Sequence, residues 1–150
     1  MIRIVRAEAG SDRLLKWVGY EGVTILDFAR DREYELVSVG RFPVGSGGTI
    51  DWTETPGELV IATGDDGQIE SFVDRFMPES DSYVLLWSNF AIPGVVVSAA
   101  KLADYLPDIL DRNPEFWIYG PGSGVLLENT FAGVVTVSRI PGGEDPVRCR

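Results

Sequence analysis

Residues 116–140, FWIYGPGSGVLLENTFAGVVTVSRI, decide the fold because they read as three consecutive strands. Each run is rich in aromatic, aliphatic or β-branched residues, the types that favour extended chain. Short segments of glycine, proline and asparagine separate the runs and are typical of turns. The predicted strands are Phe116–Tyr119, Gly124–Glu128 and Val134–Ile140.

A first helix is predicted upstream of this stretch. Apolar residues recur there at the spacing of one buried helical face, and Pro78 ends the pattern because proline cannot continue the helical hydrogen-bond ladder. Asp65 or Asp66 is the expected cap. The predicted buried face consists of Ile69, Phe72, Val73, Phe76 and Met77.

A second helix is predicted to begin at Ser98, a residue type that caps helices, and to end at Asn113 and Pro114. Pro107 lies inside its apolar pattern. We therefore expect either a kink or two short helices, the later one with Pro107 at its first position. The predicted buried face consists of Leu102, Tyr105, Leu106, Ile109 and Leu110.

The remaining strands are predicted around these helices. Tyr83–Trp87 is an uninterrupted apolar run, which is typical of a strand covered on both faces, and we expect it at the centre of the sheet. Val23–Phe28 and Tyr34–Phe42 predict a hairpin with a turn at residues 31–32. Shorter strands are predicted at residues 2–6, 59–62 and 95–97.

The segment Pro43–Gly57 is so rich in glycine and proline that it predicts a long loop or an irregular hairpin arm. We expect Asp51, Trp52 and Glu54 at its tip. Large aromatic residues are favoured both in cores and at interfaces, so Trp52 is either a packed residue or an exposed anchor for a partner.

The order of the elements indicates the fold class. Strands gather towards the two ends of the chain and helices lie in the middle, without the alternation of a parallel doubly wound sheet. The sequence therefore predicts an α+β fold, in which an antiparallel or mixed β-sheet carries two helices mainly on one side. The 150 residues, 45% of them hydrophobic, correspond to a single domain, with 141–150 as a flexible tail.

The charge is strongly negative. The chain contains 13 lysine and arginine residues and 23 aspartate and glutamate residues, which gives a formal net charge of −10. Such a chain repels nucleic acid and anionic membrane surfaces, so we expect neither as a partner. The charge serves either solubility alone or attraction to a basic protein.

Cysteine usage and hydropathy indicate the compartment. Cys149 is the only cysteine, which excludes an intramolecular disulfide and a thiolate metal cage. The first residues lack the apolar core of a signal peptide, and no stretch approaches the ~20 apolar residues of a membrane span. We expect a cytoplasmic protein.

The residue types argue against catalysis. Histidine is absent, so the commonest general base and metal ligand is missing. The glycine-rich segments 45–48 and 120–124 lack the lysine and the following helix of phosphate-binding loops and are better explained as turns. Carboxylate pairs remain, at 51 and 54, 65 and 66, and 104 and 108, each with a simpler structural role. We expect no enzyme, no cofactor and no bound metal.

The most suggestive pattern is acidic. Asp104, Asp108 and Asp111 are spaced to share one face of the second helix, opposite its apolar residues, and Glu115 follows closely. Lys101 and Arg112 only partly offset these charges, whereas a solubilising face usually mixes both signs. A solvated helix face and a partner-binding stripe both fit this pattern.

One resemblance bears on function. The stretch SAAKLADYLPDIL, residues 98–110, followed by EFWIY, residues 115–119, resembles the helix-then-strand passages of small bacterial immunity proteins. These are the antitoxins of contact-dependent inhibition and other polymorphic toxin systems. The resemblance implies a cytoplasmic protein that binds one cognate toxin domain, often a nuclease, and covers its active site or its substrate-binding surface. It implies no catalytic residues.

Three hypotheses follow. The first is an immunity protein that attracts a basic toxin through Asp104, Asp108, Asp111 and Glu115, with Trp52 and Glu54 as further contacts. The second is a small carboxylate enzyme that holds a divalent cation, for example at Asp65 and Asp66. The third is an adaptor domain that forms homo-oligomers through its edge strands.

Overall fold

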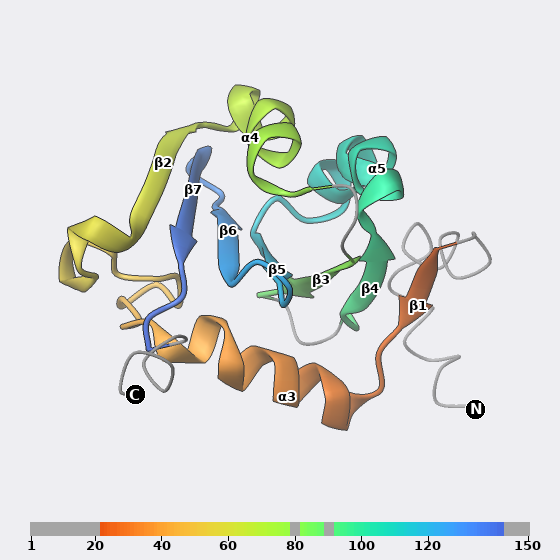
Figure 1. The fold of residues 1–150 in the computed structure, drawn as a ribbon, viewed down its shortest axis with the longest axis horizontal. Helices are drawn as coiled ribbons and strands as arrows, with labels where there is room; N and C mark the ends of the chain where they lie inside the picture. Colours follow the sequence, from red (N-terminus) through yellow and green to blue (C-terminus); the bar gives the residue numbers. More distant parts are fainter. Residues whose placement is uncertain (1–21, 79–81, 89–91, 143–150) are drawn as a thin grey trace.

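The computed structural model describes residues 22–78, 82–88 and 92–142, and all elements named below lie in these ranges (Figure 1). The strands are β1 Val23–Ile25, β2 Val60–Asp65, β3 Ser82–Trp87, β4 Val95–Ser98, β5 Phe116–Gly120, β6 Val125–Asn129 and β7 Val134–Arg139. The helices are α3 Phe28–Val37, α4 Ile69–Phe76 and α5 Ala99–Arg112.

The strands form one antiparallel sheet with the order β1-β4-β3-β5-β6-β7-β2. The predicted α+β class is confirmed, and so are the three C-terminal strands, which lie side by side. Residues Tyr83 to Trp87 of β3 are all buried, as expected of a strand covered on both faces. The middle position belongs to β5, with β3 directly beside it.

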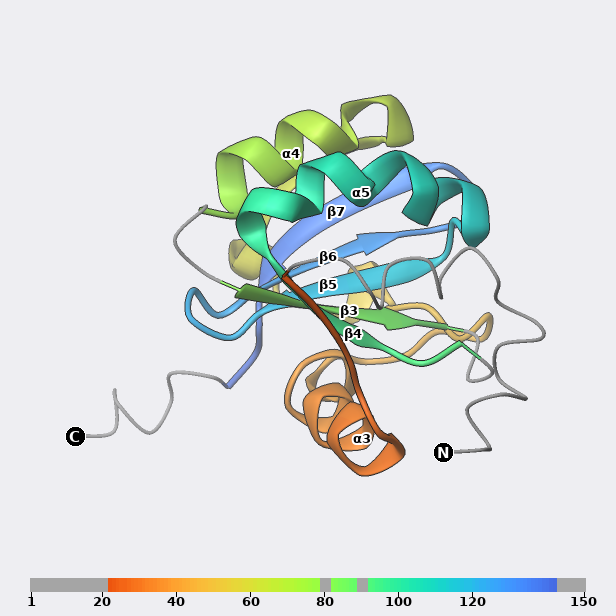
Figure 2. The same ribbon diagram turned by 90° about the vertical axis from the view of Figure 1, so that its right-hand side faces the viewer.

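Helices cover both faces of the sheet. Figure 2 shows α4 and α5 side by side on one face and α3 on the other. The larger core lies between the sheet and the α4–α5 layer, where side chains such as Leu102, Leu106 and Ile109 of α5 are at most 1% exposed. A smaller buried cluster on the α3 side contains Val84, Leu86, Trp117 and Leu126. Along their strands, these residues alternate with residues of the larger core on the opposite face.

Helix α3 occupies a segment for which the sequence predicted a β-hairpin, and that prediction is wrong. The chain was expected to form a hairpin from Val23–Phe28 and Tyr34–Phe42, but only Val23–Ile25 is a strand and Phe28–Val37 is helical. The physical reason is local. Asp27 caps the helix by accepting a hydrogen bond from the Arg30 N–H at 2.8 Å, and ion pairs at i,i+3 spacing join residues 30 to 33 and 32 to 35.

The predicted cap of α4 also needs correction, whereas the predicted cap position of α5 is confirmed. Helix α4 has Gln68 at its N-cap, without a side-chain cap bond, because residues 66–68 form a 3-10 turn before it. Asp65 instead accepts a hydrogen bond from the Gly67 N–H within that turn, at 3.0 Å. Ser98 does occupy the N-cap of α5, but its side chain makes no cap bond. Helix α5 continues through Pro107, so the alternative of two short helices is wrong.

The segment between Pro43 and Gly57 is an irregular hairpin followed by a turn. Val44 and Ile50 form an isolated antiparallel bridge, and the turn between them lies at residues 45–48. Trp52–Glu54 is a 3-10 turn that comes after the hairpin, so these residues and Asp51 are not at its tip as expected. The predicted strand at 2–6, Trp17, Cys149 and the tail beyond Gly142 lie outside the described residues.

Candidate partner-binding surface

Helix α5 exposes its carboxylates on one face and packs its opposite face against the sheet. Asp104, Asp108 and Asp111 are all exposed, whereas the apolar residues opposite them are buried against the sheet. Because Leu102 and Leu106 are completely buried, the helix is held by packing and not by its charged side chains. The three carboxylates are therefore carried by a helix whose position on the sheet is fixed by packing.

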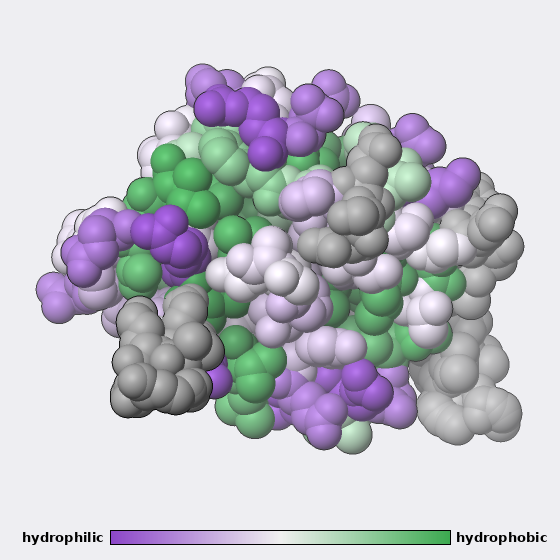
Figure 3. All heavy atoms as spheres, viewed as in Figure 1, coloured by the Kyte–Doolittle hydropathy of each residue, from purple (hydrophilic) through white to green (hydrophobic). Residues whose placement is uncertain are grey.

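The neighbouring helix adds to this negative surface. Glu70 and Asp74 of α4 are exposed, and the outer side of α4 is hydrophilic at the top of Figure 3. Of the cations in this layer, Arg75 stacks over the Phe76 ring, 4.9 Å from its centroid, and Lys101 is half-buried. We call this surface the α4–α5 layer, and its described side chains include five carboxylates and two cations.

Glu115 is separated from this layer. It is half-buried and lines a cavity of about 400 Å³ together with Glu35 and Trp117, on the α3 side of the sheet. The sequence placed Glu115 close to Asp111, but the turn at residues 113–115 leads the chain into β5 and away from the outer surface of α5. The structure therefore brings Asp104, Asp108 and Asp111 together and leaves Glu115 apart.

Trp52 and Glu54 also lie on the α3 side. Trp52 is half-buried, and its ring packs edge-on against Phe42 with centroids 5.3 Å apart. Its indole N–H donates a hydrogen bond of 2.8 Å to Glu128. Glu54 is exposed. Trp52 thus anchors its own segment to the sheet.

The residue that the sequence reading missed is Glu128. Its carboxylate is 2% exposed and accepts three hydrogen bonds, from the Ile50 N–H at 2.8 Å, the Trp52 indole at 2.8 Å and the Trp117 indole at 2.9 Å. One signal was available, because the predicted strands 116–119 and 124–128 pair so that Trp117 lies opposite Glu128. This Glu128 cluster fastens the segment 50–54 to the sheet.

Burial raises the pKa of the Glu128 carboxyl above its ordinary value of 4.5 and is the largest effect. The three hydrogen bonds lower this pKa, and the nearby charge of Glu115 raises it, but each of these effects is smaller than that of burial. A folded-state pKa above the unfolded value means that the folded protein binds more protons between the two values. Stability from this group is therefore complete below the unfolded pKa and is lost as the pH rises through the folded pKa.

We expect this titration to be visible by comparison with a Glu128→Gln variant, which cannot titrate at this position. The wild-type protein, measured relative to the variant, should lose free energy of unfolding as the pH rises from 4.5 upward. Urea unfolding of both proteins from about pH 4 to about pH 8 measures this difference. A difference that stays constant, or that grows in favour of the wild type, would contradict the raised pKa.

The other predicted carboxylate pairs have local structural roles. Asp51 accepts hydrogen bonds from the N–H and the hydroxyl of Thr53, at 3.1 and 2.6 Å, and so caps a 3-10 turn. Asp65 caps the turn before α4. Within the described ranges, no group of three or more histidine, cysteine, aspartate or glutamate side chains is arranged to hold a metal ion. Nor does any helix in this part of the chain have the length and apolarity to cross a membrane.

Comparison with known protein families and with curated proteins found no relative of this chain. No model of a known protein family matches the chain, and no curated protein matches it in sequence.

Proposed function

We propose that this protein is an immunity protein, which binds a cognate protein toxin with a basic surface and blocks its active site or its substrate-binding surface. The observation that carries the proposal is the outward row of Asp104, Asp108 and Asp111 on a helix whose other face is buried. A nuclease toxin needs positive potential to hold its substrate, and these carboxylates offer the opposite charge.

The electrostatics favour fast capture. With a net charge of −10, the whole chain attracts a cationic partner at long range, and the α4–α5 layer presents a local excess of carboxylates. Such complementarity mainly raises the association rate, which falls as salt screens the charges. An inhibitor that must act before a toxin reaches its substrate benefits from this kinetic advantage.

Rigidity favours affinity. The carboxylates of α5 are carried by a helix that is packed on the sheet, so little backbone ordering is needed on binding. A backbone that is already ordered loses less conformational entropy on binding than a loop that must become ordered. The surface therefore combines charge with preorganisation.

The test uses the product of the gene directly upstream of this one as the candidate toxin. We expect a complex whose association rate constant falls as the ionic strength rises. In the variant with Asp104→Asn, Asp108→Asn and Asp111→Asn, the association rate constant should fall about tenfold at low salt. Stopped-flow or surface-plasmon measurements over a range of salt concentrations give this constant.

The matched control changes the net charge equally but elsewhere. Glu33, Glu54 and Glu58 are exposed and lie outside the α4–α5 layer, so their replacement by glutamine should leave the association rate within about twofold. A larger loss in this control than in the aspartate variant would assign the interface to the other side of the sheet and contradict the role of α5. The absence of any complex at low ionic strength would sink the proposal.

A further inference from the structure

Strand β2 forms one end of the sheet, and its outer edge is open. It pairs with β7 on its inner side, and Figure 1 shows it as the outermost strand, with no other described element beside its free edge. Its residues alternate between half-buried and exposed, and none is fully buried. An edge strand presents a row of main-chain donors and acceptors that another extended chain can join.

The direction of the main-chain groups of β2 follows from its pairing with β7. The N–H and the C=O of Val134 both point away from β2, because they bond to Thr130 on the β6 side. Val134 lies opposite Asp65, so Asp65 also turns its N–H and its C=O away from β7. This direction alternates along an antiparallel pair, so Thr63, two residues earlier, presents its N–H and its C=O to the free edge as well.

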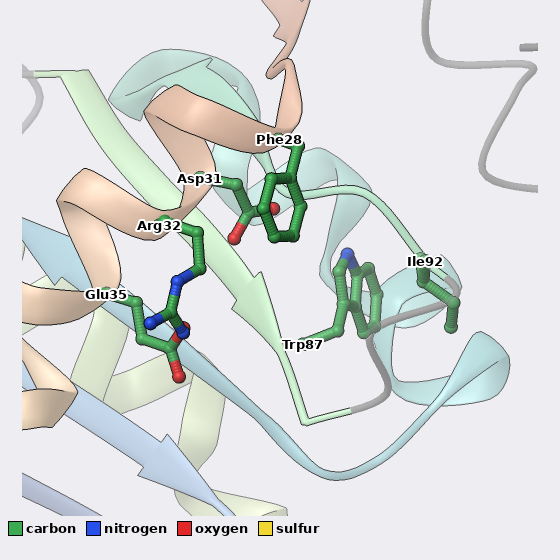
Figure 4. A pocket seen from close by; sticks show the side chains of 6 residues that line it. All are labelled: Phe28, Asp31, Arg32, Glu35, Trp87 and Ile92. Carbon is green, nitrogen blue, oxygen red and sulfur yellow. The ribbon is translucent and has the colours of Figure 1, made fainter.

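Side chains occupy other main-chain N–H groups at the periphery of the sheet. The outward N–H of Asp65 donates to Gln68 Oε1 at 3.1 Å. In the segment before β4, the Gly94 N–H donates at 2.8 Å to Asp31, which Figure 4 shows projecting from α3. No group of the described residues plays this part for the outward N–H and C=O of Thr63. The open edge is therefore centred on Thr63.

A bulge limits the length of this open edge. The register shifts between Val60 and Ala62, so the regular part of β2 is Ala62–Asp65. Bulges and charged side chains are devices that protect edge strands from unwanted pairing, and here the bulge lies at the beginning of the strand and the charge at its end. The three residues between them carry no charge and include no proline. A short extended segment can therefore pair here, whereas a long strand would meet the bulge.

The charges around this edge favour a basic segment. Glu58, two residues before β2, and Asp65, its last residue, are both exposed. Arg139 of the neighbouring β7 donates to the main-chain carbonyl of Glu58 at 2.9 Å and offsets these carboxylates only in part. A second copy of this chain would bring a further net charge of −10 and be repelled, whereas a cationic segment is attracted.

We propose that the free edge of β2 binds a short extended segment of a partner protein, in which uncharged β-branched residues lie between two basic residues. The segment joins the sheet as an antiparallel strand beside Ala62–Asp65, and its main chain bonds to the N–H and the C=O of Thr63. Its basic side chains pair with Glu58 and Asp65. The site lies on β2 and not on the α4–α5 layer, so it does not depend on the proposed function and is tested without a toxin.

The probe is the capped peptide Lys-Thr-Val-Thr-Val-Thr-Lys, added at millimolar concentration to the full-length, ¹⁵N-labelled protein. We expect the amide NMR signals of residues 62–65 to shift and the hydrogen exchange of the Thr63 amide to slow about tenfold. Two control peptides test the mode of binding. One has two consecutive prolines at its centre and so lacks donors on both edges, and the other has glutamate in place of both lysines. Each should bind at least about fivefold more weakly.

Three variants test the contacts on β2. Thr63→Pro removes the outward N–H without breaking the ladder to β7 and should weaken binding of the lysine peptide about tenfold. Thr63→Val keeps both main-chain groups and is the matched control, which should bind within about twofold of the wild type. Gln68→Ala frees the Asp65 N–H and should strengthen binding about fivefold, the effect of one added hydrogen bond. This last variant decides the outcome if Thr63→Pro does not fold.

Three results would overturn the proposal. The first is a Thr63 amide signal that the lysine peptide does not move. The second is binding of the proline peptide or the glutamate peptide that is as tight as that of the lysine peptide. The third is a homodimer, seen by light scattering, that Thr63→Pro dissociates, because a second copy of the chain would then occupy the edge.

Discussion

Replacement of Glu128 by alanine should lower the free energy of unfolding by about 3–5 kcal/mol, because it leaves three N–H groups, two of them in buried hydrogen bonds, without an acceptor. Two of these groups belong to the segment that contains Ile50 and Trp52, so the variant should also loosen this segment from the sheet. The relief of a costly buried carboxylate, which the raised pKa of Glu128 reflects, offsets only part of the loss.

Urea unfolding monitored by tryptophan fluorescence gives the free energy, and Glu58→Ala serves as the matched control. Glu58 is exposed, so that substitution should change stability by less than about 0.5 kcal/mol. Glu128→Gln should fall between the two, because its amide oxygen can still accept from two N–H groups while its NH₂ faces the third. Equal stability of Glu128→Ala and the wild type would show that the Glu128 cluster does not hold the segment.

The parts of the fold that sequence reasoning found are those with strong periodicity. Helices α4 and α5 each bury one apolar stripe, and strands β5, β6 and β7 are runs rich in aromatic, aliphatic or β-branched residues separated by turn residues. In both cases the buried side chains follow the geometry of the local backbone. Such patterns lie within a few consecutive residues, so they can be recognised without knowing which distant residues pack against them.

Helix α3 was missed because it lacks this signal. None of its residues is fully buried, and its apolar residues lie at its two ends and not along one face. Its signals are the Asp27 cap and the charge pairs at i,i+3 spacing, which contribute only tenths of a kcal/mol each apart from the cap. Aromatic and β-branched residues at 34 and 37 favoured a strand on propensity alone.

The candidate surface was predictable only in part. Helical spacing alone places Asp104, Asp108 and Asp111 on one exposed face, as the structure shows. The position of Trp52 was not predictable in this way, because its partner Glu128 is 76 residues away in the sequence. The burial of the Trp87 indole, whose N–H has no hydrogen-bond partner among the described residues, is likewise set by distant parts of the chain, which no local pattern encodes.

The two sides of the sheet consequently have different characters. The α4–α5 layer is tightly packed below and acidic outside, which suits recognition of a large charged surface. The α3 side has a smaller core, a helix without fully buried residues and cavities along its flanks.

Substitution of Gly120 by alanine is the second change expected to have a large effect on stability. Gly120 ends β5, and a Cβ atom there would lie 2.6 Å from a ring carbon of Tyr83 and 2.8 Å from the Ser123 hydroxyl oxygen. Tyr83 is completely buried, so its ring cannot move aside without disturbing the core. We expect the free energy of unfolding to fall by about 1–3 kcal/mol, the usual cost of overpacking.

Gly57→Ala is the matched control, because an added Cβ atom at Gly57 meets nothing within 4 Å. Its stability should stay within about 0.5 kcal/mol of the wild type in the same urea titration. A Tyr83→Leu variant makes the steric cause testable, since alanine at 120 should cost less when the ring is gone, giving a measurable coupling in a double-mutant cycle. If the cost of Gly120→Ala is the same with and without the Tyr83 ring, the close approach of these two residues is not its cause.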